Sequence, residues 1–269
     1  MSSMLELDFT ELSHPGAVRT NNEDFAGRFI PTSPEQGRSH GWLFAVADGV
    51  GGQDLGEVAS RTAVESVIAG FRQAATGEAH STVLPRIVKA ANMQVYEAGR
   101  AASPGGVGMA TTLVTCALRY DKATIAHVGD SRCYLIRAGE ATALTRDHTV
   151  VAEQVRLGVM SAKEAATAET RHILSRSIGN DLFVNVDVTE HQVIPDDVLL
   201  LCSDGLYGPV PPADLANIIN NTSDLATAAE RLLGLANQRD GGDNVTMQLI
   251  QVRSVERVGM YRGRPYKLR

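Results

Sequence analysis

The pattern of apolar and polar side chains divides the chain into a series of strands and helices. Residues 5–12 alternate apolar and polar side chains, as in a half-buried strand, and residues 42–47 form an apolar run that predicts a buried strand ending at Asp48. Further strands are predicted at 111–118, 123–128, 132–137, 183–190, 197–202 and 244–252. Apolar residues at three- and four-residue spacing predict helices over 53–75, 82–99, 149–178, 213–220 and 223–238, and residues 31–41 are expected to form a loop.

Local signals define several of these boundaries. Pro85 is expected in the first turn of its helix, where a missing N–H costs nothing. Ser161 and Glu164 have the spacing of a capping box, and Ser223 is a candidate N-cap. The segment Ser103-Pro104-Gly105-Gly106-Val107-Gly108 breaks the chain and is interpreted as a turn, because it lacks the Lys-Ser/Thr of a phosphate-binding loop and precedes a strand.

Short connections indicate antiparallel strands in the middle of the chain. Only Tyr120-Asp121-Lys122 and Gly129-Asp130-Ser131 separate the strands predicted between 111 and 137. Parallel neighbours would need crossovers of a dozen or more residues, so these strands are predicted to be antiparallel. Strands, helices, a run of strands, helices and a last strand follow one another, which predicts one α+β domain with antiparallel sheets covered by helices.

The composition is that of a globular protein whose buried cysteines are expected to be reduced. The 269 residues are 43% hydrophobic and 21% charged, enough apolar material for a sizeable core. No apolar run approaches the roughly 18 residues of a membrane span, and residues 1–6 lack the features of a secretion signal. Cys116, Cys133 and Cys202 lie inside apolar runs, so we expect reduced core thiols and a cytoplasmic protein.

Charge is distributed unevenly along the chain. The net charge is −6, but residues 253–269 carry six basic side chains and one acidic side chain, so the preceding 252 residues carry −11. An acidic body argues against nonspecific nucleic-acid binding, and we expect no nucleic-acid partner. The basic tail is either a solvated or partly packed arm or a segment that docks to an acidic partner or a kinase.

Acidic residues recur where predicted strands begin or end, each beside a glycine. A single Asp-Gly pair at a strand end is most often an ordinary turn. Here the pattern recurs at Asp48-Gly49, Gly129-Asp130, Asp204-Gly205 and Gly242-Asp243, and Glu23-Asp24 adds a further acidic pair. The repetition predicts that these carboxylates converge on one site.

Such a cluster of carboxylates implies a metal. Carboxylates within about 5 Å of one another raise each other's pKa unless a cation compensates them. The ligands would be hard oxygens without matching Cys or His spacing, which favours Mg²⁺ or Mn²⁺ over Zn²⁺. Two ions that share a carboxylate can activate a water for attack on phosphorus, and Arg19 can bind a phosphate group through its guanidinium.

These residues fall within seven motifs spread over residues 19–246. The motifs are Arg19-x-x-Asn22-Glu23-Asp24, Asp48-Gly49-Val50-Gly51-Gly52, Gly108-Met109-Ala110-Thr111-Thr112, Val128-Gly129-Asp130-Ser131-Arg132, Leu144-Thr145-Arg146-Asp147-His148, Ser203-Asp204-Gly205-Leu206 and Asp243-Asn244-Val245-Thr246. With these motifs in family order, the chain resembles the protein phosphatase 2C (PPM) family of metal-dependent Ser/Thr phosphatases, most closely its compact bacterial members. The resemblance implies a sandwich of two antiparallel β-sheets flanked by helices, in four layers.

The resemblance also implies roles for individual residues. Residues 149–178 match the flap beside the family's active site. Eukaryotic members place a proposed general-acid His where this chain has Val50, so the leaving-group acid is unassigned, with His148 and His172 as candidates by position only. By the resemblance, Asp48 would bridge two metals, Asp204 and Asp243 would complete the ligands of one metal, and the Gly49 carbonyl would bind the second metal. Glu23 and Asp24 would contact the metals through coordinated waters. Asp130 would recruit a third metal, and Arg19 would hold the substrate phosphate.

The resulting hypothesis is a cytoplasmic phosphoserine/phosphothreonine protein phosphatase with two Mn²⁺ or Mg²⁺ ions and a third weaker one. Hydrolysis would proceed by direct attack of a metal-bound water, without a phosphoenzyme. Its partners would be phosphorylated proteins, including a bacterial Ser/Thr kinase and its targets. The catalytic domain is expected over 1–252 and the basic tail over 253–269.

Two alternatives stay open at this point. One is a catalytically silent phosphatase-like regulator that binds phosphoproteins, and the other is a hydrolase of small phosphomonoesters. A Ser-based hydrolase is disfavoured by the absence of Gly-x-Ser-x-Gly. A cysteine phosphatase is excluded because no Cys is followed six residues later by Arg.

Overall fold

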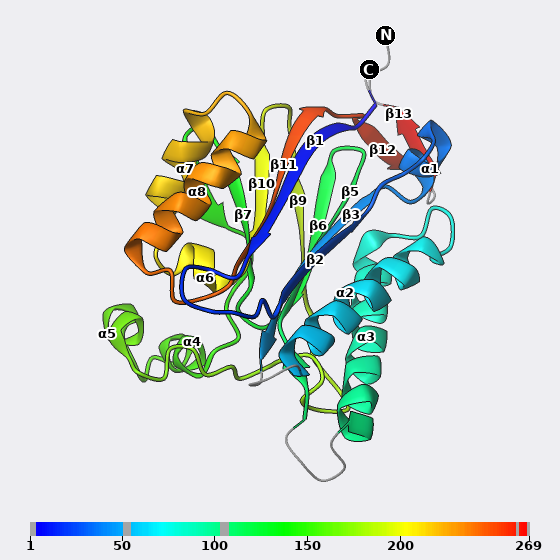
Figure 1. The fold of residues 1–269 in the computed structure, drawn as a ribbon. Helices are drawn as coiled ribbons and strands as arrows, with labels where there is room; N and C mark the ends of the chain where they lie inside the picture. Colours follow the sequence, from blue (N-terminus) through cyan, green and yellow to red (C-terminus); the bar gives the residue numbers. More distant parts are fainter. Residues whose placement is uncertain (1–3, 51–54, 103–107, 262–263, 268–269) are drawn as a thin grey trace.

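Two antiparallel β-sheets stack face to face in the computed structural model, which describes residues 4–50, 55–102, 108–261 and 264–267 (Figure 1). The first sheet has the order β1-β11-β10-β7-β8 and the second β2-β3-β5-β6-β9, with short β4 paired to β3. The first sheet contains β1 (Glu6–His14), β7 (Arg132–Arg137), β8 (Glu140–Ala143), β10 (Val198–Cys202) and β11 (Val245–Ser254). The second contains β2 (Asp24–Phe29), β3 (Trp42–Val50), β4 (Ala110–Thr111), β5 (Leu113–Arg119), β6 (Lys122–Val128) and β9 (Asp187–Gln192).

Helices cover the outer face of each sheet. Helices α2 (Leu55–Arg72) and α3 (His80–Ala102) lie on the second sheet, and α7 (Pro212–Asn220) and α8 (Leu225–Arg239) lie on the first (Figure 1). Apolar side chains form three separate buried clusters, one between the sheets and one beneath each helical layer. The predicted four-layer α+β sandwich is therefore confirmed.

Strand β3 shows why a central strand is apolar without alternation. Leu43, Ala45 and Ala47 pack beneath α2 and α3, while Phe44 and Val46 pack between the two sheets. Successive side chains of a strand point to opposite faces. Because both faces of β3 are covered, every position from 43 to 47 is fully buried.

The strands on either side of Gly129 belong to different sheets. Strand β6 pairs with β5 and β9, whereas β7 pairs with β10 and β8, all antiparallel. The predicted antiparallel arrangement of the whole run is therefore wrong for β6 and β7, which are not partners. Gly129 has φ +101°, and a Cβ there would lie 2.7 Å from the side chain of Thr112. A short connection excludes a crossover helix but does not specify which sheet the next strand joins.

The flap segment departs most from the sequence prediction. The helical prediction over 149–178 is correct only for two short helices, α4 (Val150–Arg156) and α5 (Ala162–Thr167), and is wrong for the turns that follow them. Gly158, at φ +72°, lies between the two helices, and α5 buries none of its residues. Helical periodicity persists only where an apolar face is buried. The capping box of Ser161 and Glu164 is confirmed.

Other boundaries differ in detail. Asp224 rather than Ser223 caps α8, because its carboxylate accepts the N–H of Thr227 (2.8 Å). Helix α3 begins at His80, so Pro85 lies inside the helix instead of in its first turn. The expected loop over 31–41 contains helix α1 (Pro34–Ser39), and β2 and β8 were not predicted because their short, mixed sequences lack a strand period.

The basic tail continues the structure beyond the last family motif. Strand β11 runs to Ser254, and β12 (Val258–Tyr261) and β13 (Arg264–Lys267) form an antiparallel hairpin. Glu256 is nearly buried and accepts a hydrogen bond from Arg38 Nε (3.0 Å). The start of the tail is thus packed against the body. The turn predicted around Gly105-Gly106 and the pair Gly51-Gly52 lie outside the described residues.

The remaining global expectations concern thiols and membranes. Cys116, Cys133 and Cys202 are free and buried, as predicted. Among the helices in the described ranges, none combines the length and apolarity needed to cross a bilayer.

Candidate metal centre

The predicted acidic residues gather around one cavity of about 280 Å³. Seven of the eight predicted site residues line it. The exception is Asp24, which is buried with only 5% exposure and lies close enough to Asp48, Asp204 and Asp243 for mutual repulsion. The seven are Arg19, Glu23, Asp48, Gly49, Asp130, Asp204 and Asp243. Residues separated by more than 200 positions in sequence therefore meet at one point.

Strand ends bring these residues together. Asp24 at the start of β2 pairs directly with Asp48 near the end of β3. Asp130 follows β6, Asp204 follows β10 and begins the short helix α6 (Asp204–Tyr207), and Asp243 lies just before β11. Both sheets contribute, so the cavity lies where the ends of the two sheets meet.

The backbone around Asp48 is held by two threonines. The Asp48 N–H donates to Thr112 Oγ1 (2.9 Å), and the Asp48 carbonyl accepts from the Thr112 N–H (2.8 Å) and from Thr111 Oγ1 (2.7 Å). Thr112 Oγ1 also shares a hydrogen bond of 2.6 Å with Ser131 Oγ. These bonds connect the end of β3 to the turn that carries Asp130, although sequence reasoning assigned Thr112 no role.

Burial and mutual repulsion raise the pKa of the clustered carboxyls. Burial raises the pKa of Asp24 to about 7, and Asp204 and Asp243 add repulsion. Burial, with repulsion from Asp204 and Asp147, likewise raises the pKa of Asp130 to about 7. The pKa of Asp48 is raised well above its usual range, first by burial and then by the four surrounding aspartates.

The donor set fits a divalent cation. Asp24 Oδ1 and Asp204 Oδ1 are buried and have no hydrogen-bond partner among the described residues. A buried carboxylate oxygen without a partner is costly, and a cation would offset that cost. Carboxylate and carbonyl oxygens are the ligands that Mg²⁺ and Mn²⁺ prefer. We therefore infer that the cluster is built to bind hard divalent ions.

Glycines allow the first turn of α2 to approach the site. A Cβ on Gly49 would lie 2.3 Å from the Gly56 carbonyl oxygen, and one on Gly56 would lie 2.3 Å from Glu23 Oε2. A side chain at position 49 would therefore force a shift of the backbone, and one at position 56 would displace the Glu23 carboxylate. The carboxylate of Glu23 thus lies at the N-terminal end of α2, where the helix dipole favours negative charge.

Arg19 lies at the rim of the cavity in contact with a predicted metal ligand. Its Nη2 is 2.9 Å from Asp243 Oδ1, and its Nε donates to the Gly242 carbonyl (3.1 Å). The guanidinium is about half exposed. One edge of the Arg19 guanidinium therefore faces the acidic cluster. Its remaining N–H groups are available to bind an anion.

Asn244 is a supporting residue that sequence reasoning quoted in a motif without giving it a role. Its Oδ1 accepts the Glu23 N–H (2.8 Å), and its Nδ2 donates to the carbonyls of Pro15 (3.0 Å) and Asn21 (2.9 Å). One buried amide thereby holds the whole segment that carries Arg19 and Glu23. Its position directly after Asp243 was the only available signal.

The two candidate histidines lie in different environments. His172 borders the cavity, with Nδ1 3.7 Å from Asp204 Oδ2 and a side chain 60% exposed. His148 is buried, and burial lowers its pKa to about 4, so it is neutral. It does not line the cavity, so a direct role in leaving-group protonation is not supported for it.

His148 instead braces the turn that carries Asp130. Its Nδ1 accepts the Gly129 N–H (3.2 Å), which places the imidazole proton on Nε2, 3.2 Å from Asp187 Oδ2. The His148 N–H donates to the Gly129 carbonyl (3.0 Å), and Arg176 pairs with the same Asp187 (2.8 Å). One potential ligand atom from each of His127, His148 and Asp187 lies within 4.8 Å of the others, and buried His148 Nε2 has no hydrogen-bond partner of good geometry among the described residues.

Comparison with known proteins agrees with this geometry. The protein phosphatase 2C family model matches residues 13–245. The chain is 33% identical over 252 residues to the serine/threonine phosphatase Stp of Listeria welshimeri, which covers 93% of this chain and 95% of that protein. The structure of the Streptococcus agalactiae serine/threonine phosphatase has a TM-score of 0.84 and 32% identity, covering 92% of this chain and all of that one.

A second similar structure contains metal. The catalytic domain of the serine/threonine phosphatase PstP, in complex with two manganese ions, has a TM-score of 0.79 and 31% identity, covering 93% of this chain and all of that one. The chain belongs to the protein phosphatase 2C family. It is a metal-dependent serine/threonine protein phosphatase, and nothing in these comparisons favours the catalytically silent alternative.

Proposed function

We propose that this phosphatase dephosphorylates phosphoserine and phosphothreonine proteins at a centre of two divalent ions held by the acidic cluster. The observation that carries this proposal is the convergence of five aspartates with two unpartnered buried oxygens, beside an arginine at the cavity rim. When bound, the ions would supply an acidified water for attack on phosphorus. The five aspartates are Asp24, Asp48, Asp130, Asp204 and Asp243.

In this proposal the side chains of the protein bind the ions and orient the substrate. Asp48, whose pKa is raised by the other four aspartates around it, would be shared by both ions. Asp204 and Asp243 would complete one ion's ligands and the Gly49 carbonyl would serve the other. Glu23 and Asp24 would act through coordinated waters.

Arg19 would bind the substrate phosphate through the edge of its guanidinium not used by Asp243. This contact would orient the phosphoryl group over the acidic cluster. Because Arg19 also touches Asp243, substrate binding and metal binding would be coupled at this point.

Mn²⁺ is the ion we propose to operate, with Mg²⁺ as a substitute. The all-oxygen donor set is compatible with both, and the similar PstP structure holds two manganese ions. Asp130 would recruit a third, weaker ion. Its raised pKa indicates that a nearby cation would be strongly favoured there.

The domain limits and partners are also proposals. We place the catalytic domain at 1–252, with the flap at 149–178 and the basic tail at 253–269. The bacterial origin of the similar phosphatases supports a Ser/Thr kinase and its targets as partners. The cytoplasm is the compartment that we propose, because the chain has buried free thiols.

Hydrolysis of a phosphothreonine peptide with and without Mn²⁺ tests the mechanism. Wild-type protein is expected to be active with Mn²⁺ and inactive in EDTA, and Asp204→Asn is expected to lose about a hundredfold in kcat/KM, because even residues that only support metal ligands cost about 10–100-fold. Asp8→Asn, the same chemical change at an exposed position of β1, serves as the control. Metal-independent turnover, or an undiminished Asp204→Asn rate, would contradict the proposal.

Asp130→Ala tests the third ion. The substitution keeps the Asp130 carbonyl that Tyr207 Oη contacts (3.0 Å), so the turn is retained. We expect kcat to fall about tenfold at saturating Mn²⁺. The third ion would be lost, and with it the stabilisation of negative charge that develops in the transition state. Full activity of Asp130→Ala at saturating metal would show that Asp130 recruits no functional ion.

A further inference from the structure

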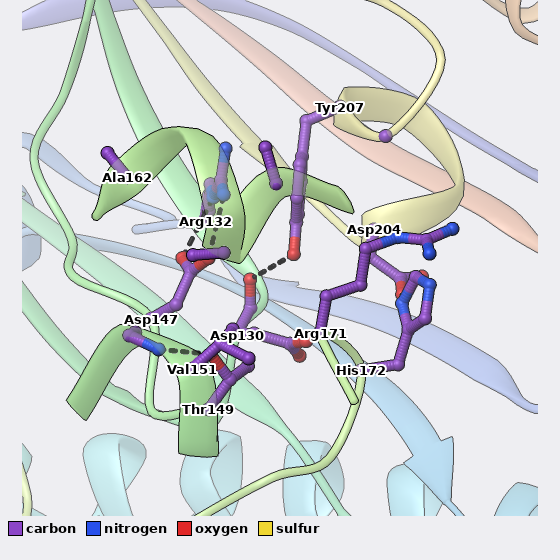
Figure 2. Close-up of a pocket in the computed structure, with 14 residues that line it drawn as sticks. Asp130, Arg132, Asp147, Thr149, Val151, Ala162, Arg171, His172, Asp204 and Tyr207 are labelled. Carbon is purple, nitrogen blue, oxygen red and sulfur yellow. Dashed lines mark hydrogen bonds and ion pairs between the residues drawn. The ribbon is translucent and has the colours of Figure 1, made fainter. Parts of the chain in front are cut away.

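A second cavity, of about 370 Å³, adjoins the metal centre on the flap side. Asp130, His172 and Asp204 line both cavities, so the two are continuous. Figure 2 shows Arg132 and Asp147 on one side of this cavity, Arg171, His172 and Asp204 on the other, and Asp130 between them. The proposed function leaves this space unused.

Arg132 and Asp147 form a charged pair in the wall of this cavity, and they already bond to each other. Arg132 donates to both oxygens of Asp147 (2.8 and 2.7 Å) and, through Nη1, to Tyr134 Oη (2.7 Å). Its guanidinium also lies 3.6 Å from the centroid of the Tyr207 ring. A bidentate pair of this kind is strong and internally neutral. Arg132 and Asp147 therefore offer a ligand little net charge.

The flap supplies the apolar part of the cavity wall. Ala162, Ala165 and Ala166 of α5 line the cavity, as does Val151 of α4. Positions i, i+3 and i+4 share one face of a helix. Helix α5 nevertheless buries none of its residues. Its alanine face is directed at an open cavity, with the aromatic ring of Tyr207 also in the lining.

We propose that this cavity is a subsite for an apolar side chain of the substrate, within two residues of the phosphorylated one. The inference rests on the proposed function, because the phosphate must lie in the adjoining acidic cavity. An extended peptide advances about 3.3–3.6 Å per residue. A residue one or two positions away therefore lies within a side chain's reach of a cavity that shares three lining residues with the first.

Charge disfavours the other classes of side chain. In the proposed function Asp130 and Asp204 hold cations, and Asp147 is paired with Arg132, so a basic side chain would find no free carboxylate. Arg171 lines the cavity without an ion pair among the described residues, and it would repel a basic group. An acidic side chain would be attracted by Arg171 but would lose hydration against the alanine wall, and hydrolysis of the Asp-containing peptide distinguishes these two effects.

Phosphothreonine peptides that differ at one flanking position test the subsite. Each neighbour within two residues is changed in turn to Leu, Ala, Lys or Asp, and kcat/KM is measured with Mn²⁺ for wild type, Ala165→Leu and Ala162→Leu. Ala168→Leu is the matched control, because Ala168 is the C-cap residue directly after α5 but does not line the cavity. p-Nitrophenyl phosphate hydrolysis and circular dichroism verify that each variant is folded.

Wild type is expected to prefer Leu over Ala or Lys at one flanking position by about tenfold, as for a hydrophobic pocket filled by a few methylene groups. Ala165→Leu and Ala162→Leu fill the cavity, so the preference should fall to within about twofold, whereas Ala168→Leu should retain it. Equal rates for all wild-type peptides, a preference for Lys or Asp, or equal loss in Ala168→Leu would overturn the subsite. No Mn²⁺-dependent hydrolysis of any peptide would instead overturn the proposed function.

Discussion

Asp48→Asn is expected to lower kcat/KM for a phosphothreonine peptide by at least about a thousandfold, more than any other single change at the site. The reason is its position, because Asp24, Asp130, Asp204 and Asp243 all surround Asp48 and raise its pKa. Loss of a residue that only supports a metal ligand costs about 10–100-fold, so loss of the ligand that we propose to be shared by two ions should cost more.

The same substitution should leave the fold intact and make the metal-free protein more stable. The backbone bonds from Thr111 and Thr112 do not involve the Asp48 side chain, and an amide removes one negative charge from the cluster. Activity and metal affinity should be measured beside thermal unfolding in EDTA, with Asp8→Asn as the control. A variant that keeps more than a tenth of the wild-type kcat/KM would refute the bridging role.

The stability of the metal-free protein is expected to fall as the pH rises from about 6.5 to 8.5. The pKa values of Asp24 and Asp130 are raised from 3.8 to about 7 and that of Asp48 further, so the folded protein binds more protons than the unfolded chain in this range. Stability falls with pH wherever the folded state binds more protons. Each pKa unit corresponds to about 1.4 kcal/mol, so the loss is substantial.

Buried histidines determine the lower limit of this range. The pKa values of His80 and His148 are lowered from 6.5 to about 4 by burial, so these groups make stability rise with pH up to about 6.5. Below that pH the histidines oppose the aspartates. Above it only the acidic cluster still titrates among these groups.

Thermal unfolding in EDTA and in Mn²⁺ checks this prediction. In EDTA the Tm should fall by on the order of 5 °C between pH 6.5 and 8.5, and Mn²⁺ should raise the Tm most at the higher pH, where the carboxylates are ionised. Asp48→Asn should show a smaller pH dependence. A Tm in EDTA that is flat or rises over this range would contradict the assigned electrostatics.

The sequence by itself determined which acidic residues gather around one cavity and which segments form most of the layers. Asp48, Asp204 and Asp243 could be identified because strand-end carboxylates beside glycine recur, and a run such as 42–47 is apolar throughout only when both faces are covered. Helices α2, α7 and α8 were predictable for a similar reason, since each buries one face against a sheet. These are signals of local pattern and burial.

Only the tertiary structure decided how these parts meet. It placed β6 and β7 in different sheets, because the direction of the chain after Gly129 depends on which sheet buries the next strand. It broke the flap into two short helices, since α5 buries none of its residues. It also assigned Asn244 and Thr112 their supporting bonds, and it joined a second cavity to the first through Asp130. Hydrogen bonds and cavities between distant segments leave no period in the sequence, so pattern alone could not predict them.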